Sequence, residues 1–197
     1  MENRPWHRHY DYNVPTTIRC LRISAQGLLE LSAKAYPDKA ALSFYGTEIG
    51  FWNLRQTGIR MANALAAIGV QKGDRVGIHL PTCPQYVIAY LATLSLGAIV
   101  VNLNPMYTAE ELKTLITDTG VTTLFTFDMV LPNIRPLYQD IELPRVIVTK
   151  MTDYHYSAIF FLRRSIRSDI DLLQGLREVW REGLYERVIV NPWQEHY

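Results

Sequence analysis

The sequence has few cysteines, little net charge and no long apolar run. Its two cysteines, Cys20 and Cys83, lie far apart and outside any CxxC pair, so neither a zinc site nor a thioredoxin-type motif is supported. We therefore expect a reducing, cytoplasmic setting. The formal net charge of +1 argues against a nucleic-acid partner. No run of about 20 apolar residues could cross a bilayer, which leaves only peripheral contact with a membrane.

Glycine patterns that cradle phosphate groups are also missing. The glycines stand singly, for example at Gly58, Gly69 and Gly97. Neither the Walker spacing G-x-x-x-x-G-K-[ST] nor G-x-G-x-x-G occurs. Without a glycine-rich turn before a helix, an unrelated nucleotide-binding domain of the doubly wound type is disfavoured.

The chain does contain two strand–helix units in succession between Gly69 and Gly120. Residues 75–80 form a short apolar run typical of a strand buried on both faces. The pair Thr82 and Gln85, with Pro84 in the first turn, predicts a helix start. That helix is apolar almost all round, which predicts burial on more than one side. A second strand at 98–103 precedes a capping box, Thr108 to Glu111, and a helix that ends at Gly120.

Further strands follow at a regular step. Expected strands begin near residues 75, 99, 122 and 145, a spacing of about one strand–helix unit that implies right-handed crossovers. The fold class expected is α/β, with a mainly parallel sheet and flanking helices. Other expected elements are a helix at 19–36, a hairpin of strands 40–45 and 48–51, a helix capped by Asn53 that runs to Ile68, a short helix from 129 or 132 to 138, and strands at 145–149 and 187–190.

Four segments together resemble a known family. They are Gly73–Val76, Leu80–Pro84, Gly97–Ala98 and Asn102–Leu112. Their order and spacing are similar to the amino-terminal part of adenylate-forming (AMP-binding) enzymes, and most of all to bacterial long-chain fatty acid–CoA ligases. The resemblance covers roughly residues 4–155. It implies the amino-terminal subdomain of that fold and, for the intact enzyme, ATP and Mg²⁺-dependent conversion of a fatty acid to an acyl-adenylate, which then passes to CoA.

The known active-site motifs of that family do not occur in this sequence. The Ser/Thr/Gly-rich loop followed by Pro-Lys-Gly is absent, and so are the aromatic-Gly-x-Thr-Glu motif, the ribose-binding Asp and the carboxy-terminal Lys. The expectation is therefore a truncated fold: residues 1–155 form the α/β part, and 156–197 form a divergent helical tail that ends before the phosphate loop. No catalytic, cofactor-binding or metal-binding residue is assigned, no cofactor is expected to bind this chain, and the isolated chain is expected to be inactive. The alternative is a non-catalytic module that pairs with a separate chain or with a second copy.

Three polar residues near strand ends are weaker candidates. Asn102 and Asn104 lie at the carboxyl end of a strand, where open α/β sheets bind ligands, although a role in turning the chain into Pro105 is the better interpretation. His79 lies in an apolar strand and is better explained as a core histidine with satisfied hydrogen bonds than as a base.

The segment 157–184 is amphipathic and rich in arginine. One interpretation is a helix that lies on a membrane surface, with arginines against lipid phosphates. The other is a helix docked on the core with a solvated charged face. The acidic residues of the same segment, such as Asp169 and Glu178, favour the docked helix.

Overall fold

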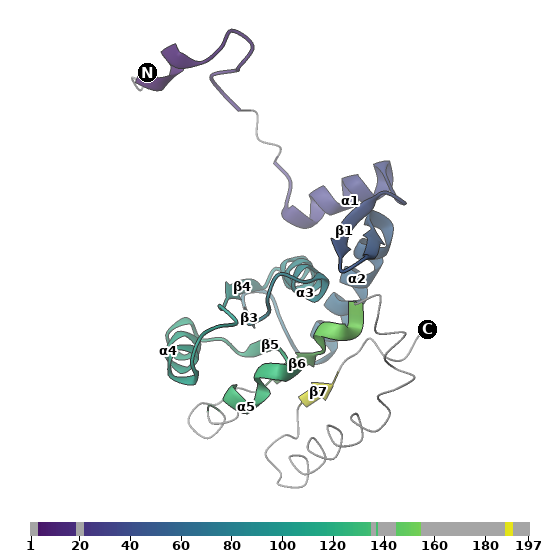
Figure 1. The fold of residues 1–197 in the computed structure, drawn as a ribbon, viewed down its shortest axis with the longest axis vertical. Coiled ribbons are helices and arrows are strands. Elements are labelled where there is room, and N and C mark those ends of the chain that lie inside the picture. Colours follow the sequence, from purple (N-terminus) through teal and green to yellow (C-terminus); the bar gives the residue numbers. More distant parts are fainter. Residues whose placement is uncertain (1–3, 19–21, 135–136, 138–144, 155–187, 191–197) are drawn as a thin grey trace.

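A five-stranded parallel sheet forms the centre of the protein in the computed structural model, which describes residues 4–18, 22–134, 137, 145–154 and 188–190 (Figure 1). The strand order is β4-β3-β5-β6-β7, with every neighbouring pair parallel. The strands are β3 (Arg75–Ile78), β4 (Ile99–Asn102), β5 (Thr123–Phe127), β6 (Arg145–Thr149) and β7 (Val188–Val190). The predicted parallel sheet and all five of its predicted strands are thereby confirmed.

The three inner strands form because they are short, apolar and covered on both faces. In β3, Val76 and Ile78 are fully buried, and Gly77 between them leaves no room for a side chain, because a Cβ there would lie 3.1 Å from Leu103, Leu124 and Val121. Its neighbours pair in register on both sides, with Ile78 opposite Asn102 of β4 and Phe125 of β5. Strand β3, which comes first in the chain, is thus an inner strand of the sheet.

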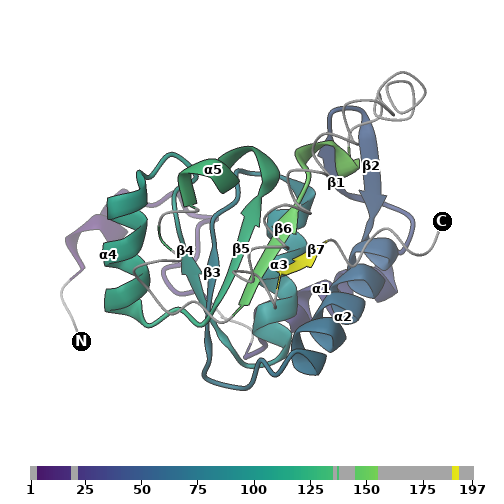
Figure 2. The same ribbon diagram turned by 90° about the horizontal axis from the view of Figure 1, so that it is seen from below.

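One face of the sheet is covered by three helices, α1 (Ala25–Ala35), α2 (Phe51–Ala67) and α3 (Pro84–Ser95), as Figure 2 shows. Helix α3 lies against β3 and β4 and is covered in turn by α2 and α1. Every side chain of α3 before Ser95 is buried or half-buried. This layering confirms that the apolar helix needs cover on more than one side. The core on this face includes Leu54, Met61, Leu65, Val76, Ile78, Ile88, Ala92 and Phe125.

The opposite face is covered by α4 (Ala109–Thr119) and α5 (Leu131–Ile134). The predicted capping box is present: the Thr108 hydroxyl accepts from the Glu111 amide, and the Glu111 carboxylate accepts from the Thr108 amide at 2.8 Å. Gly120 ends α4 with φ 65°, a left-handed conformation that glycine adopts without steric cost. The core on this face includes Leu103, Leu112, Ile116, Leu124, Ile134, Val146 and Val148.

A small antiparallel hairpin stands beside the main sheet. Its strands are β1 (Ala40–Phe44) and β2 (Thr47–Gly50), which differ by one residue at one or both ends from the predicted 40–45 and 48–51, and α2 follows directly. Helix α1 is tied to α2 by Glu30, whose two carboxylate oxygens share the single Nε–H of Arg55 at 2.8 and 2.7 Å. The remaining short elements are the 3-10 helices η1 (Pro5–His9), η2 (Asp128–Val130) and η3 (Met151–Tyr154), and η1 lies apart from the sheet (Figure 1).

Three predicted helix starts are wrong. Helix α1 begins at Ala25 rather than at residue 19, because the Ser24 hydroxyl accepts from the Gly27 amide and caps it there. Helix α2 begins at Phe51, directly after β2, so Gly50 rather than Asn53 is its N-cap. Helix α3 has Cys83 rather than Thr82 as N-cap, with Pro84 in the first helical position.

Several predictions lie outside the described residues. The helix and the amphipathic segment expected within 156–184 are among them, and so is Cys20. Of the short helix expected before residue 138, α5 covers Leu131–Ile134. Within the described part of the chain, no helix combines the length and apolar character needed to cross a membrane.

Candidate functional site

Several polar residues lie at the carboxyl ends of the parallel strands, next to the apolar core. The connection from β3 runs to β4 on one side, whereas β5 pairs with β3 on the other. Open α/β sheets bind ligands outside the carboxyl edge at such a reversal of strand order. The candidate site is therefore the edge between β3 and β5, together with the turn that follows β4.

His79 occupies this position directly after β3. Its side chain is 1% exposed, and its Nδ1 lies 3.1 Å from the hydroxyl of Thr126 on β5. Burial lowers the pKa of His79, and the backbone of Asn104 and Pro105 near the ring offsets part of that decrease. The imidazole is consequently neutral at physiological pH. Its Nε2 makes no hydrogen bond of ordinary geometry within the described part of the chain, so the expectation of a fully satisfied core histidine is wrong for that nitrogen.

The two asparagines of the predicted site have structural partners. Asn102 Oδ1 accepts from the hydroxyl of Tyr86 at 3.0 Å, which links the end of β4 to α3. Asn104 Oδ1 accepts from the Met106 amide at 3.0 Å, and its carbonyl accepts from the Tyr107 amide. This is the turn geometry that Asn stabilises with its own side chain. The structural interpretation of Asn104 is confirmed, while Asn102 joins two elements that sequence alone did not connect.

A second group of polar residues lies beyond β5 and β6. Burial raises the pKa of Asp128, opposed by the Met129 amide that donates to it and by the charge of Lys150. The Lys150 carbonyl accepts from Gln85 Nε2 of α3 at 2.9 Å. Gln85 itself is buried, and its Oε1 has no hydrogen-bond partner within the described residues. Sequence reasoning missed these residues, although each follows the end of a predicted strand or opens a predicted helix.

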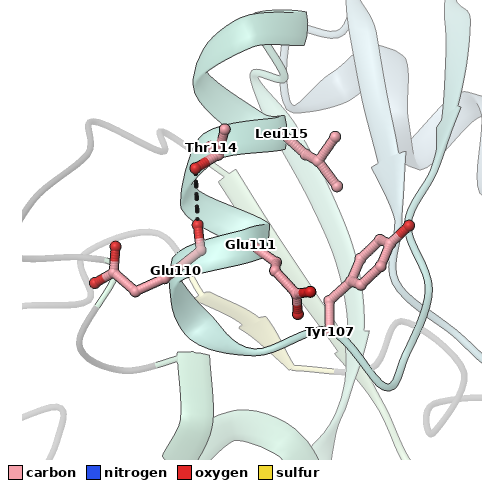
Figure 3. A pocket seen from close by; sticks show the side chains of 5 residues that line it. All are labelled: Tyr107, Glu110, Glu111, Thr114 and Leu115. Carbon is pink, nitrogen blue, oxygen red and sulfur yellow. Dashed lines mark hydrogen bonds between the residues drawn. The ribbon is translucent and has the colours of Figure 1, made fainter.

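A shallow hollow of about 430 Å³ lies beside the turn that follows β4, at the start of α4 (Figure 3). It is lined by Tyr107, Glu110, Glu111, Thr114 and Leu115. Hydrogen bonds in the capping box lower the pKa of Glu111, and Thr114 donates to the Glu110 carbonyl at 3.0 Å. Two carboxylates and no cationic side chain line this hollow, so it is unsuited to bind phosphate.

The described residues do not assemble a nucleophile or a metal centre. No cluster of three or more His, Cys, Asp or Glu side chains that could hold a metal is present in this part of the chain. Cys83 is buried, and burial raises the pKa of its thiol, so it is not an activated nucleophile. The carboxyl edge supplies neutral hydrogen-bonding groups, the carboxyl group of Asp128 with its raised pKa, and the charge of Lys150 near it.

The sequence of this α/β unit matches the AMP-binding enzyme family over residues 29–160. The chain belongs to that family. The family resemblance predicted from the four sequence segments is thus confirmed.

Among its relatives, a long-chain-fatty-acid–CoA ligase of Bacillus subtilis (strain 168) is 35% identical over 151 residues, which are 77% of this chain and 27% of the relative. A long-chain-fatty-acid–CoA ligase of Escherichia coli O6:H1 is 31% identical over 150 residues, 75% of this chain and 27% of that protein. The crystal structure of a long-chain-fatty-acid–CoA ligase from Archaeoglobus fulgidus superimposes with a TM-score of 0.63 at 26% identity, covering 68% of this chain and 28% of the other. The chain therefore spans little more than a quarter of the length of these relatives.

Proposed function

We propose that this chain is the amino-terminal portion of a long-chain fatty acid–CoA ligase. The observation that supports the proposal is the 35% identity to the Bacillus subtilis ligase over 151 residues. In the complete enzyme, ATP, Mg²⁺, fatty acid and CoA would be the reactants. The role of this portion would be to present the sheet and its carboxyl edge to the remainder of the enzyme.

We further propose that residues 1–155 are the α/β part of the AMP-binding domain and that 156–197 are a divergent tail. The 197-residue polypeptide is expected to be inactive by itself. Adenylation requires groups that hold the ATP phosphates and stabilise the charge that develops on the transferring atoms. The sequence has no Ser/Thr/Gly-rich phosphate loop, and the hollow beside α4 is acidic. No catalytic or cofactor-binding residue is therefore assigned to this chain.

The test measures ATP binding and fatty acid-dependent exchange of pyrophosphate into ATP. The purified chain should show neither activity, while the full-length Bacillus subtilis ligase serves as the positive control. A chimera in which residues 29–155 replace the matching segment of that ligase should retain exchange activity. Exchange by the lone chain would refute its inactivity. A folded but inactive chimera would refute its place in a long-chain ligase.

A second candidate is a non-catalytic module that pairs with a separate chain. Helix α1 favours it, because Leu28 and Leu31 are each about half exposed on its outer side, at 52% and 53%. Exposed apolar side chains on neighbouring turns are typical of interaction surfaces. Analytical ultracentrifugation tests pairing with a second copy, because self-association that the Leu28→Ser and Leu31→Ser substitutions abolish would favour a module of this kind. A cytoplasmic location remains a prediction for either candidate.

A further inference from the structure

The outer edge of β4 is a row of backbone groups that the sheet does not use. Strand β4 ends the sheet, and among the described strands it pairs with β3 alone (Figure 1). The amides of Ile99 and Leu103 donate to carbonyls on the β3 side at 2.8 and 3.0 Å. Successive residues of a strand direct their amides and carbonyls to opposite sides. The amides and carbonyls of Val100 and Asn102 therefore face away from the sheet.

Nothing in the sequence of this strand protects its outer edge. Residues 98–103 contain no charged residue and no proline. The Ile99 side chain is 47% exposed. Edge strands of natural proteins are commonly guarded by lysine, proline, a bulge or a covering element, because an open apolar edge is a template for another strand. The edge of β4 is therefore suited to accept a further strand.

Aromatic side chains flank this edge on both faces of the sheet. On the α3 face the rings of Tyr86 and Tyr90 stack with their centroids 6.2 Å apart, and the Tyr86 hydroxyl donates to Asn102 at the end of β4. On the α4 face, Tyr107 and Leu115 pack on the core. All four of these flanking side chains are only partly buried. Tyrosine is enriched in protein–protein interfaces, so the flanks fit the same use as the edge.

The two ends of the edge carry opposite charge. At the amino end, a Cβ on Gly97 would lie 3.1 Å from Lys72 Cγ, so the Lys72 side chain lies beside the start of β4. Lys72 forms no ion pair with another described residue. Asp74 is near, but its carboxylate accepts from a loop amide at 2.9 Å. At the carboxyl end, Glu110 and Glu111 line the hollow beside the turn that follows β4 (Figure 3).

Two copies of this edge are complementary when they run antiparallel. In an antiparallel pair, residues directly opposite each other exchange both of their backbone hydrogen bonds. A register centred on Val101 sets Val100 opposite Asn102 of the second copy, so the outward groups of both residues are used. The same register sets Gly97 opposite Pro105, which brings the cationic end of each strand to the acidic hollow of the other copy. A parallel arrangement would instead bring like charges together.

We propose that the outer edge of β4 is a self-association surface: two copies of this chain pair β4 with β4, antiparallel about a two-fold axis, with Lys72 of each copy against Glu110 and Glu111 of the other. The two-fold axis uses the same edge of both copies, so the assembly closes as a dimer. This inference holds whether or not the proposed ligase function is correct. It also concerns a different surface from Leu28 and Leu31 on α1.

The first experiment uses the unaltered 197-residue chain. Hydrogen exchange is followed by NMR at increasing protein concentration, and analytical ultracentrifugation gives the monomer–dimer equilibrium over the same range. Exchange of the Val100 and Asn102 amides should slow as the dimer forms. The Val101 amide faces β3 and is the internal control, because its exchange should not depend on concentration.

Matched isoleucine substitutions then test the surface. Ile99→Lys places a charge on the paired edge and should abolish the dimer. Ile59→Lys makes the same change on α2, where the side chain is 37% exposed, and should leave the dimer intact. Leu31→Ser on α1 should also leave it intact. The exchange measurement needs no substitution, so it decides the question even if Ile99→Lys fails to fold.

A charge exchange between copies tests the register. Lys72→Glu and Glu110→Lys each bring like charges together at both ends of the paired strands, so each should raise the dissociation constant of the dimer by about tenfold. An equimolar mixture of the two variants should restore pairing, because both contacts of the mixed dimer again join opposite charges. Only a contact between copies predicts recovery on mixing.

Four results would overturn the proposal. The chain could remain monomeric at every concentration, or the Val100 and Asn102 amides could exchange at a rate independent of concentration. A dimer lost in Leu31→Ser but kept in Ile99→Lys would place the interface on α1. A mixture no more associated than its two separate variants would refute the antiparallel register.

Discussion

Gly77 should tolerate no side chain, and the substitution Gly77→Ala tests how tightly the α4 face of the sheet is packed. An ideal methyl group at this position would lie 3.1 Å from each of three carbon atoms, in Leu103, Leu124 and Val121. The favourable separation of two such carbons is about 3.5–4.0 Å, so each contact would have to lengthen by roughly 0.4 Å or more. All three side chains are buried, and their room to move is small.

The expected loss of stability follows from two opposing effects. Overpacking a well-packed core costs about 1–3 kcal/mol. The alanine also restricts the unfolded chain, which returns about 0.4–1 kcal/mol where the backbone permits alanine. Gly77 has no positive φ, so this gain applies. The net expectation is a loss of roughly 1–2 kcal/mol and a fall in Tm of about 2–8 °C for a chain of this size.

The matched control is Gly58→Ala in α2. Gly58 is buried too, yet a methyl group there would meet nothing within 4 Å. Replacing glycine by alanine inside a helix should stabilise the chain by about 0.5–1 kcal/mol. Thermal and urea unfolding of both variants give the comparison. A Gly77→Ala variant as stable as the parent, or two variants that shift Tm in the same direction, would refute the packing argument.

Other substitutions test further parts of the structure. Ile78→Ala should lower the free energy of unfolding by ~2–5 kcal/mol in urea, because removing the fully buried Ile78 side chain leaves a cavity. A loss below about 1 kcal/mol would contradict that burial. Thr108→Ala should cost about 0.5–2 kcal/mol through the lost cap, whereas Thr108→Ser should restore most of it. The free energy of unfolding should fall as the pH drops below about 6.5, because unfolded His79 takes up a proton that the folded side chain resists, and His79→Leu should lose this part of the slope. In a Cys20→Ser background, Cys83 should react with iodoacetamide only at the rate of unfolding, since burial raises the pKa of its thiol, and rapid labelling of the native chain would contradict this.

The strands were predictable because burial on both faces leaves a strong signal in the sequence. The apolar run 145–149 coincides with β6, and the other predicted strands of the main sheet differ from the observed ones by one or two residues. Helix starts were less predictable. Thr82 and Gln85 have the same spacing as Thr108 and Glu111, but only the second pair forms a capping box. The Gln85 side chain instead donates a hydrogen bond to the Lys150 carbonyl, which lies 65 residues away in the chain, and local sequence cannot indicate such a contact.

The contacts around the candidate site were less predictable than the strands that carry it. The rule that ligands lie at the carboxyl ends of strands directed attention to Asn102 and Asn104, and the apolar run around His79 marked it as a buried histidine. It could not show that Tyr86 would bind Asn102 or that Thr126 would bind His79, because both bonds depend on how distant segments align. The burial of Asp128 likewise follows from the packing around the end of β5, and not from its neighbours in sequence.

The inner position of β3 in the sheet has a consequence for synthesis on the ribosome. Its partner on one side, β4, begins 24 residues after Arg75, whereas its partner on the other side, β5, begins 48 residues after Arg75. At a translation rate of about 5–20 residues per second, the β5-facing edge of β3 remains unpaired for roughly 2–10 s, until β5 has been synthesised. During that interval an apolar edge is open to strands of other nascent chains. Growth conditions that slow elongation between residues 99 and 127 should therefore increase aggregation of the newly made protein without changing the stability of the finished fold.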